Sequence, residues 1–196
     1  NDFKFMSNGL FGYSSFEAVQ YFEDIQLDYE IKESKKVPEL YYGIYQFVVA
    51  INHFKSEAHI FKHTCEGLVG GSELSLEDIS ELICAKNFST HTFTPHHNEK
   101  SNCTDQEYLQ MIRQAKDHCK RGDVFQLVLS REFSQTFSGD DFNLYRALRS
   151  INPSPYLFYF DYGSFKIFGS SPEAQIIIKA GQAEIHPIAG TFRRTG

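Results

Sequence analysis

The clearest hydrophobic periodicity of the 196-residue chain lies between Thr104 and Gly122. One helical face would carry Tyr108, Met111, Ile112, Ala115 and Cys119. Thr104 and Glu107 have the spacing of a capping box, and Gly122 is typical of the residue that ends a helix. The pattern therefore predicts an amphipathic helix between Thr104 and Gly122.

The pattern changes after Gly122 to the alternation expected of strands. A first strand is predicted from Asp123 to Phe133, with Gln126 on the same face as Val124 and Val128. A helix is predicted from Asp141 to Ser150, and the prolines that follow it would end it. Three further strands are expected at Tyr156–Phe160, Phe165–Gly169 and Ala174–Lys179.

The first part of the chain is rich in Tyr and Phe, and its patterns also favour strands. Strand-like runs at Tyr41–Phe54 and Glu57–His63 predict a hairpin that turns near Lys55 and Ser56. A short amphipathic helix follows, with Ser75 as its N-cap. Strands and helices in this order predict an α+β fold with antiparallel pairing rather than a series of βαβ units.

Three zones are predicted along the chain, at residues 1–86, 87–103 and 104–196. The middle zone has little apolar periodicity and is interpreted as a linker. It contains His91, His96 and His97, which could form a metal site or could simply be solvated. Solvation is favoured, because no nearby carboxylate or thiol completes a ligand set.

The composition of the chain argues against several classes of function. The net charge is −6, and no long basic run is present, which argues against nucleic-acid binding. No apolar stretch is long enough to span a bilayer. The first residues show neither a start methionine nor a signal peptide, so residue 1 is interpreted as an internal cut. Four dispersed cysteines, without a CxxC pair, indicate reduced thiols in a cytoplasmic protein.

Three features could carry chemistry. Gln126 is a polar residue in an apolar strand, and it either faces solvent or meets a ligand. Glu173 follows the predicted strand in "GSSPE", where it is either part of a turn or a general acid at a strand end. The ending "HPIAGTFRRTG" combines Gly190 and Thr191 with Arg193 and Arg194, and this loop could bind a carboxylate. Each feature alone is also common in ordinary turns and surfaces.

The order of four segments is more specific than any one of them. "GDVFQLVLSREF", "NPSPYLFYF", "GSSPE" and "HPIAGTFRRTG" together resemble the chorismate-utilising enzymes, and among them component I of anthranilate synthase. The match is dense from Asp105 to Gly196, and "GLFGYSSFEAVQYFE" near the start also resembles that subunit. The resemblance implies a layered α+β fold of two packed antiparallel sheets with flanking helices, here incomplete. Residues 1–86 would belong to the N-terminal region and residues 104–196 to the first part of the chorismate-binding domain.

Two positions distinguish members of the family. Isochorismate and salicylate synthases have a water-activating lysine where Gln126 stands, and aminodeoxychorismate synthases have a nucleophilic lysine where Ala189 stands. The absence of both lysines is similar to anthranilate synthase, a lyase whose nucleophile is ammonia. The resemblance makes Glu173 the general acid, gives Gln126 a place in the catalytic site, and assigns Gly190, Thr191 and Arg193 to substrate binding. Phe192 stands where many relatives have an arginine, which leaves the arginine contact open.

The resemblance also implies a regulator, a metal and partners. The segment that resembles the family's feedback site for tryptophan consists of Asn152, Pro153, Ser154, Pro155, Tyr156, Leu157 and Phe158. The family's Mg²⁺ ligands would lie outside this chain, and a glutamine amidotransferase subunit (component II) would supply ammonia.

The chain is accordingly expected to be a fragment that is inactive by itself and that can form a homo-oligomer through uncovered sheet edges. The alternatives are component I of aminodeoxychorismate synthase and a non-catalytic module that senses tryptophan or docks to a partner.

Overall fold

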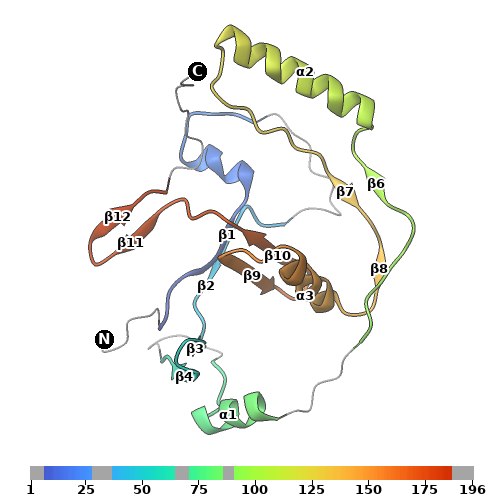
Figure 1. The fold of residues 1–196 in the computed structure, drawn as a ribbon. Coiled ribbons are helices and arrows are strands. Elements are labelled where there is room, and N and C mark those ends of the chain that lie inside the picture. Colours follow the sequence, from blue (N-terminus) through green and yellow to red (C-terminus); the bar gives the residue numbers. More distant parts are fainter. Residues whose placement is uncertain (1–6, 28–36, 65–70, 86–90, 187–196) are drawn as a thin grey trace. The chain divides into compact units, whose positions relative to one another are not determined.

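The structure is a computed structural model that describes residues 7–27, 37–64, 71–85 and 91–186 (Figure 1). Its helices are the 3₁₀ helix η1 (Phe16–Tyr21) and the α-helices α1 (Leu76–Cys84), α2 (Asp105–Arg121) and α3 (Asp141–Ile151). Within these residues no helix is both long and apolar enough to cross a membrane.

The strands form two-stranded ladders. Their bounds are β1 (Phe11–Ser14), β2 (Leu40–Gly43), β3 (Phe47–Asn52), β4 (Glu57–Lys62), β5 (Thr94–Pro95), β6 (Lys100–Ser101), β7 (Phe133–Ser134), β8 (Phe137–Ser138), β9 (Tyr156–Asp161), β10 (Lys166–Ser171), β11 (Ile177–Lys179) and β12 (Gln182–Glu184). The pairs are β1–β2, β3–β4, β5–β8, β6–β7, β9–β10 and β11–β12. Every ladder with a described register is antiparallel, and the predicted α+β class is confirmed.

The chain divides into two compact units. The first contains residues 1–89 and the hairpin tip at residues 160–167, and the second contains residues 90–159 and 168–196. The predicted division at 1–86, 87–103 and 104–196 stays a prediction. Within the expected linker, β5 and β6 pair with β8 and β7.

Aromatic packing holds the first unit around the hairpin tip. The ring of Tyr162 lies 4.4 Å from that of Tyr41 and 5.0 Å from that of Phe165, measured between centroids. Tyr13 contacts both Tyr162 and Phe165, and the Tyr13 hydroxyl donates to the Pro38 carbonyl at 2.7 Å. Such ring pairs add to the stabilisation that burial provides.

In the second unit α3 packs on the β9–β10 hairpin. The ring of Tyr145 on α3 lies 5.4 Å from Tyr159 on β9 and 6.1 Å from Phe168 on β10. Tyr159 also donates a hydrogen bond of 2.7 Å to the Asp141 carboxylate at the start of α3. These contacts hold α3 against β9 and β10. They thereby also fix the position of β10, which ends within the GSSPE segment.

The predicted helices and their caps are confirmed. Thr104 and Glu107 form a capping box at the start of α2, and Gly122 ends it in the left-handed conformation with a φ of 82°. Ser75 caps α1 in the same way with Asp78. The hairpin turn near Lys55 and Ser56 is also confirmed, and Ser56 takes a φ of 56° there.

Three strand predictions are wrong in part, and one of them, the strand expected at Ala174–Lys179, is reduced to β11 (Ile177–Lys179). The run Tyr41–Phe54 is divided between β2 and β3, with a break at residues 44–46. The strand predicted from Asp123 to Phe133 is present only at Phe133, where β7 begins. A strand needs a hydrogen-bonded neighbour, and the described residues supply none for Val124–Ser130.

Candidate functional site

One hollow in the second unit brings together the two residues that were predicted to be catalytic. It has a volume of about 610 Å³ and is lined by Gln126, Ser171, Glu173, Ala174, Gln175, Ile185 and His186. Gln126 follows α2 in the chain, whereas Glu173 follows β10. The polar residues of the lining give the hollow hydrogen-bond donors, acceptors and a carboxylate.

The turn after β10 presents Glu173. Pro172 has no N–H, and it follows the last residue of the strand, Ser171. The hydroxyl of Ser171 accepts a hydrogen bond of 3.2 Å from the Glu173 backbone N–H. The Glu173 carboxylate is exposed and forms no ion pair with any described residue, so it is available to a ligand.

Close packing fixes the strand that leads to this turn. A Cβ added to Gly169 would lie 2.6 Å from Cζ of Phe158, so the ring of Phe158 occupies the space above the glycine. Glycine is required here for the approach of the ring and not for an unusual backbone angle. In the GSSPE segment, Gly169 therefore leaves space for the ring of Phe158, and Glu173 lines the hollow.

Gln126 contributes a neutral amide. It can donate and accept hydrogen bonds, but it has no basic nitrogen and cannot remove a proton from water. Its side chain is exposed in the structure. The hollow can therefore orient a polar ligand at this wall without general-base chemistry from residue 126.

Sequence reasoning missed Ser171 and His186 as residues of this hollow. The Nε2 atom of His186 lies 3.9 Å from a carboxylate oxygen of Glu184, and the histidine is exposed. The available signal was its position directly before the proline of "HPIAGTFRRTG". For Ser171 the only signal in the sequence was its position two residues before Glu173.

The segment Asn152–Phe158 lies elsewhere and does not line the hollow. It joins the end of α3 to β9, where the Asn152 N–H donates to the Leu148 carbonyl at 2.9 Å. The Ser170 hydroxyl donates to the Asn152 carbonyl at 2.5 Å, which ties the connector to β10. These two bonds attach the connector to α3 and to β10, and the regulatory role of the segment remains a prediction.

Gly190, Thr191 and Arg193 lie outside the described residues, as does Ala189. No group of three or more His, Cys, Asp and Glu side chains in the described parts of the chain is placed to hold a metal ion. His96 instead has a ring nitrogen 3.1 Å from the Thr136 hydroxyl, and the His91 carbonyl accepts from Asn143. Cys84, Cys103 and Cys119 are free thiols.

Comparison with known proteins identifies the same family as the sequence motifs. The family model for chorismate binding enzymes matches residues 1–196. Component 1 of anthranilate synthase from Lactococcus lactis subsp. lactis (strain IL1403) is 32% identical over 195 residues, which cover 96% of this chain and 42% of the relative. The same component from Aquifex aeolicus (strain VF5) is 44% identical over 97 residues, which cover 50% of this chain and 20% of the relative.

A solved structure shows the same fold. Anthranilate synthase component I from Streptococcus pneumoniae TIGR4 matches with a TM-score of 0.74 and 26% identity, over 93% of this chain and 42% of that one. This likeness confirms the predicted α+β fold of the chorismate-utilising enzymes. The chain spans less than half the length of these relatives. From the family match over its whole length, the chain belongs to the chorismate binding enzyme family.

Proposed function

We propose that the complete gene product containing these residues is component I of anthranilate synthase, a lyase that converts chorismate and ammonia to anthranilate and pyruvate. The observation that carries the proposal is the shared hollow of Gln126 and Glu173 in a chain similar to that component over 96% of its length. Glutamine at position 126 and alanine at position 189 favour this activity over those family members that use lysine there.

Glu173 is the proposed general acid. It donates its proton to the C4 hydroxyl of chorismate, which departs as water while the nitrogen of ammonia bonds to C2. Elimination of pyruvate from the amino intermediate then gives anthranilate. The place of Glu173 in the hollow, without an ion-pair partner among the described residues that would favour its ionised form, supports this role.

Gln126 is proposed to orient the substrate or the incoming ammonia. A neutral amide at this wall cannot generate hydroxide, which favours ammonia over water as the nucleophile. Gly190, Thr191 and Arg193 are proposed to bind a carboxylate of the substrate, since a glycine turn and a guanidinium suit that group.

Mg²⁺ is the proposed cofactor of the complete enzyme. Its ligands are proposed to lie outside this chain, and the described residues contain no group of three or more His, Cys, Asp and Glu side chains that could hold a metal ion. We therefore assign no magnesium ligand within them and no catalytic step that depends on one.

The proposed partners follow from the chemistry. A glutamine amidotransferase subunit (component II) would deliver ammonia, and tryptophan would inhibit by binding at Asn152–Phe158. The 196-residue chain alone is expected to form no anthranilate and to associate with a second copy.

The test is product analysis. Purified complete gene product, supplied with chorismate, Mg²⁺ and ammonium, should release anthranilate and pyruvate in equal amounts, detected by fluorescence and chromatography. Formation of aminodeoxychorismate or isochorismate instead would refute the assignment within the family. Binding of tryptophan without any turnover would favour a non-catalytic sensor.

A further inference from the structure

Gln126 lies in a segment that no strand holds in place. The backbone groups of Val124–Ser130 form no hydrogen bond with the backbone of other described residues. A segment without such bonds opens at low free-energy cost unless its ends and side chains fix it. The position of Gln126 in its hollow therefore depends on contacts at the two ends of the segment.

The first end is anchored to the last turn of α2. Gly122 ends the helix, and the Asp123 N–H donates to the His118 carbonyl at 3.1 Å. The Asp123 carboxylate accepts two bonds from Arg121, at 3.1 and 2.8 Å, and lies 2.8 Å from Nδ1 of His118. This anchor is local in sequence, since all its members lie at the end of one helix.

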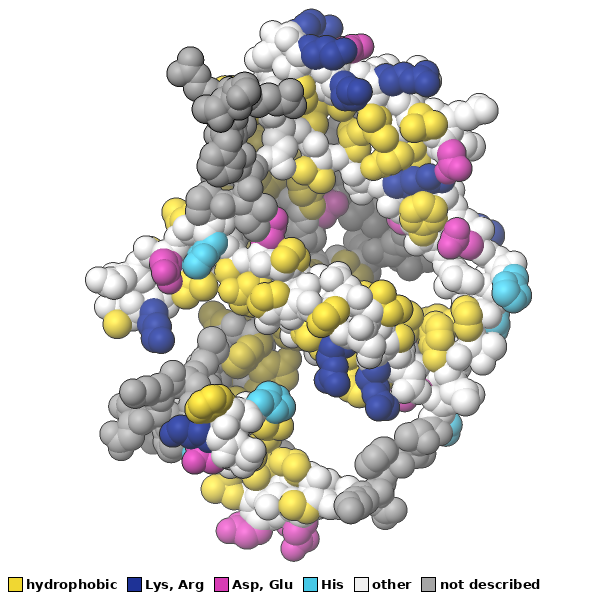
Figure 2. Space-filling view, in the orientation of Figure 1, with side chains coloured by type: hydrophobic (Ala, Val, Ile, Leu, Met, Phe, Trp, Pro, Cys, Tyr) yellow, Lys and Arg dark blue, Asp and Glu magenta, His cyan; other side chains and the backbone are white. Residues whose placement is uncertain are grey.

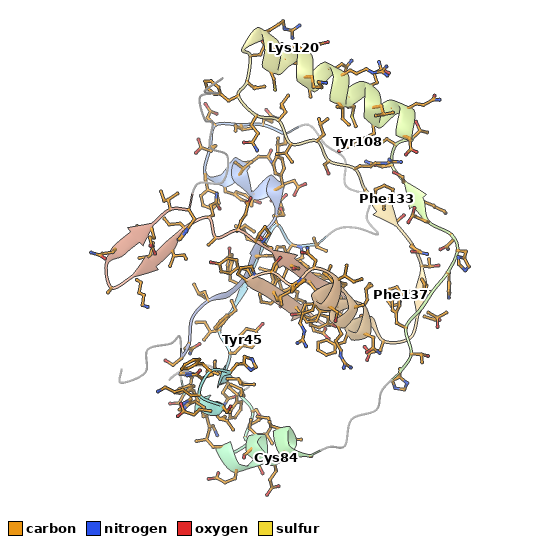
Figure 3. All side chains as sticks on the ribbon, in the orientation of Figure 1. Tyr45, Cys84, Tyr108, Lys120, Phe133 and Phe137 are labelled. Atoms are coloured by element: carbon orange, nitrogen blue, oxygen red, sulfur yellow. The ribbon has the colours of Figure 1, made fainter. Side chains whose placement is uncertain are left out.

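The second end is anchored by Arg131, which reaches the opposite end of the same helix. Its guanidinium donates to the Asp105 carboxylate at 2.7 Å and to the Ser101 hydroxyl at 2.9 Å. The guanidinium carbon also lies 4.6 Å from the ring centroid of Phe133 and 5.8 Å from that of Tyr108, two residues labelled in Figure 3. Only 17% of the Arg131 side chain is exposed, whereas its partner Asp105 is 85% exposed.

Apolar packing does not fix the middle of the segment. Leu127 and Leu129 face the apolar side of α2 across a hollow of about 410 Å³. Figure 2 shows hydrophobic side chains beside Lys and Arg in this part of the molecule. Because the leucines do not close against the helix, dispersion contacts there are incomplete and the segment could shift.

We propose that Arg131 is a positioning residue that holds Gln126 in the site by clamping the end of its segment to the start of α2. The clamp combines a fork of hydrogen bonds, a charge pair and contact with two rings. Lysine could keep the charge pair but could not reproduce the fork or the planar contact. The effect of Arg131 on catalysis rests on the proposed function. The effect of Arg131 on the position of Gln126 does not rest on it.

The first experiment tests the clamp without any substrate. Backbone ¹⁵N relaxation would be measured on the complete gene product for the wild type, Arg131→Ala, Arg131→Lys and the matched control Arg113→Lys, an exposed arginine of α2. Gln126 should have a backbone order parameter of about 0.85 in the wild type and in the control, and below about 0.6 in Arg131→Ala. Arg131→Lys should be intermediate and keeps the test valid if the alanine variant unfolds. A Gln126 amide that is equally mobile in all four proteins would overturn the proposal.

The second experiment asks whether Arg131 acts through Gln126. In the complete gene product, Arg131→Lys should lower kcat/KM for anthranilate formation by about tenfold or more, as expected when a group at the reacting centre is misplaced. The same substitution in a Gln126→Ala background should change kcat/KM less than about twofold, because coupled residues are not additive. An equal loss in both backgrounds would show that Arg131 does not act through Gln126. If the wild type forms no anthranilate, the proposed function fails, and the relaxation data alone decide on the clamp.

Discussion

Gln126 and Glu173 line the same hollow, although one follows a helix and the other follows a strand far along the chain. The pair consists of a neutral amide and a carboxylate without an ion-pair partner in the described structure. Glu173 is the candidate for protonation of a leaving group, whereas Gln126 cannot act as a base.

Glu173→Gln in the complete gene product should lower kcat by about 10²-fold or more, since glutamine keeps the shape but has no proton to transfer. Initial rates of anthranilate release measure the effect. Glu99→Gln is the matched control, because Glu99 is an exposed carboxylate of the same unit that does not line the hollow. An unchanged rate in Glu173→Gln would reduce Glu173 to a turn residue.

Gly12→Ala should destabilise the first unit by about 1–3 kcal/mol, the usual cost of inserting a methyl group into filled space. A Cβ at Gly12 would overlap the carbonyl oxygen of Tyr41, which is backbone and cannot turn aside. Gly43→Ala on the partner strand is the control, since its Cβ would meet nothing nearer than the Tyr45 ring at 3.9 Å. Urea unfolding compares the two, and equal midpoints would contradict the close approach of β1 and β2.

Tyr162→Phe should leave the free energy of unfolding unchanged or raise it. Burial is the main cause that raises the pKa of the Tyr162 hydroxyl, followed by nearby tyrosines, and the hydroxyl finds no hydrogen-bond partner among the described residues. Removal of an unsatisfied buried group recovers its desolvation cost. Tyr13→Phe should instead cost about 0.5–1.5 kcal/mol, because it removes the bond to Pro38. A larger loss in Tyr162→Phe than in Tyr13→Phe would contradict this account.

Acid should weaken α2 through Glu107. Hydrogen bonds from the backbone N–H and the hydroxyl of Thr104 lower the pKa of the Glu107 carboxyl from its ordinary value of 4.5. A lowered folded-state pKa gives stability that is present above 4.5 and is lost as the pH falls through the folded value. Helical circular dichroism should therefore decline in this range.

Glu107→Gln is the variant that tests the titration, because glutamine can still cap the helix but does not ionise. It should flatten the acid decline, whereas Glu81→Gln on α1 should not. A decline of the same size in Glu107→Gln and the wild type would assign the acid sensitivity to other groups.

The sequence predicted the helices well because their signals are local. The N-cap at Ser75, the capping box at Thr104 and the helix-ending Gly122 depend on residues within one or two turns, and each is present in the structure. The strand predicted at Asp123–Phe133 depended on a distant neighbour that the alternation of side chains cannot report. For the same reason the β5–β8 and β6–β7 pairs were missed in a segment that lacks apolar periodicity.

The candidate site was predicted in part. Gln126 and Glu173 were named from the order of the motifs, and the structure places both at one hollow. His186 and the clamp at Arg131 were not named, because their roles depend on Glu184, Asp105 and two aromatic rings that only the fold brings near them. Arg131 carried no signal beyond its place in the predicted strand.

The most direct test of the central claim is the product that the complete gene product makes from chorismate with Mg²⁺ and ammonium as the only nitrogen source. The account predicts anthranilate and pyruvate in a one-to-one ratio, with formation of both nearly abolished in Glu173→Gln. Release of isochorismate or aminodeoxychorismate in their place, or full anthranilate formation by Glu173→Gln, would contradict it.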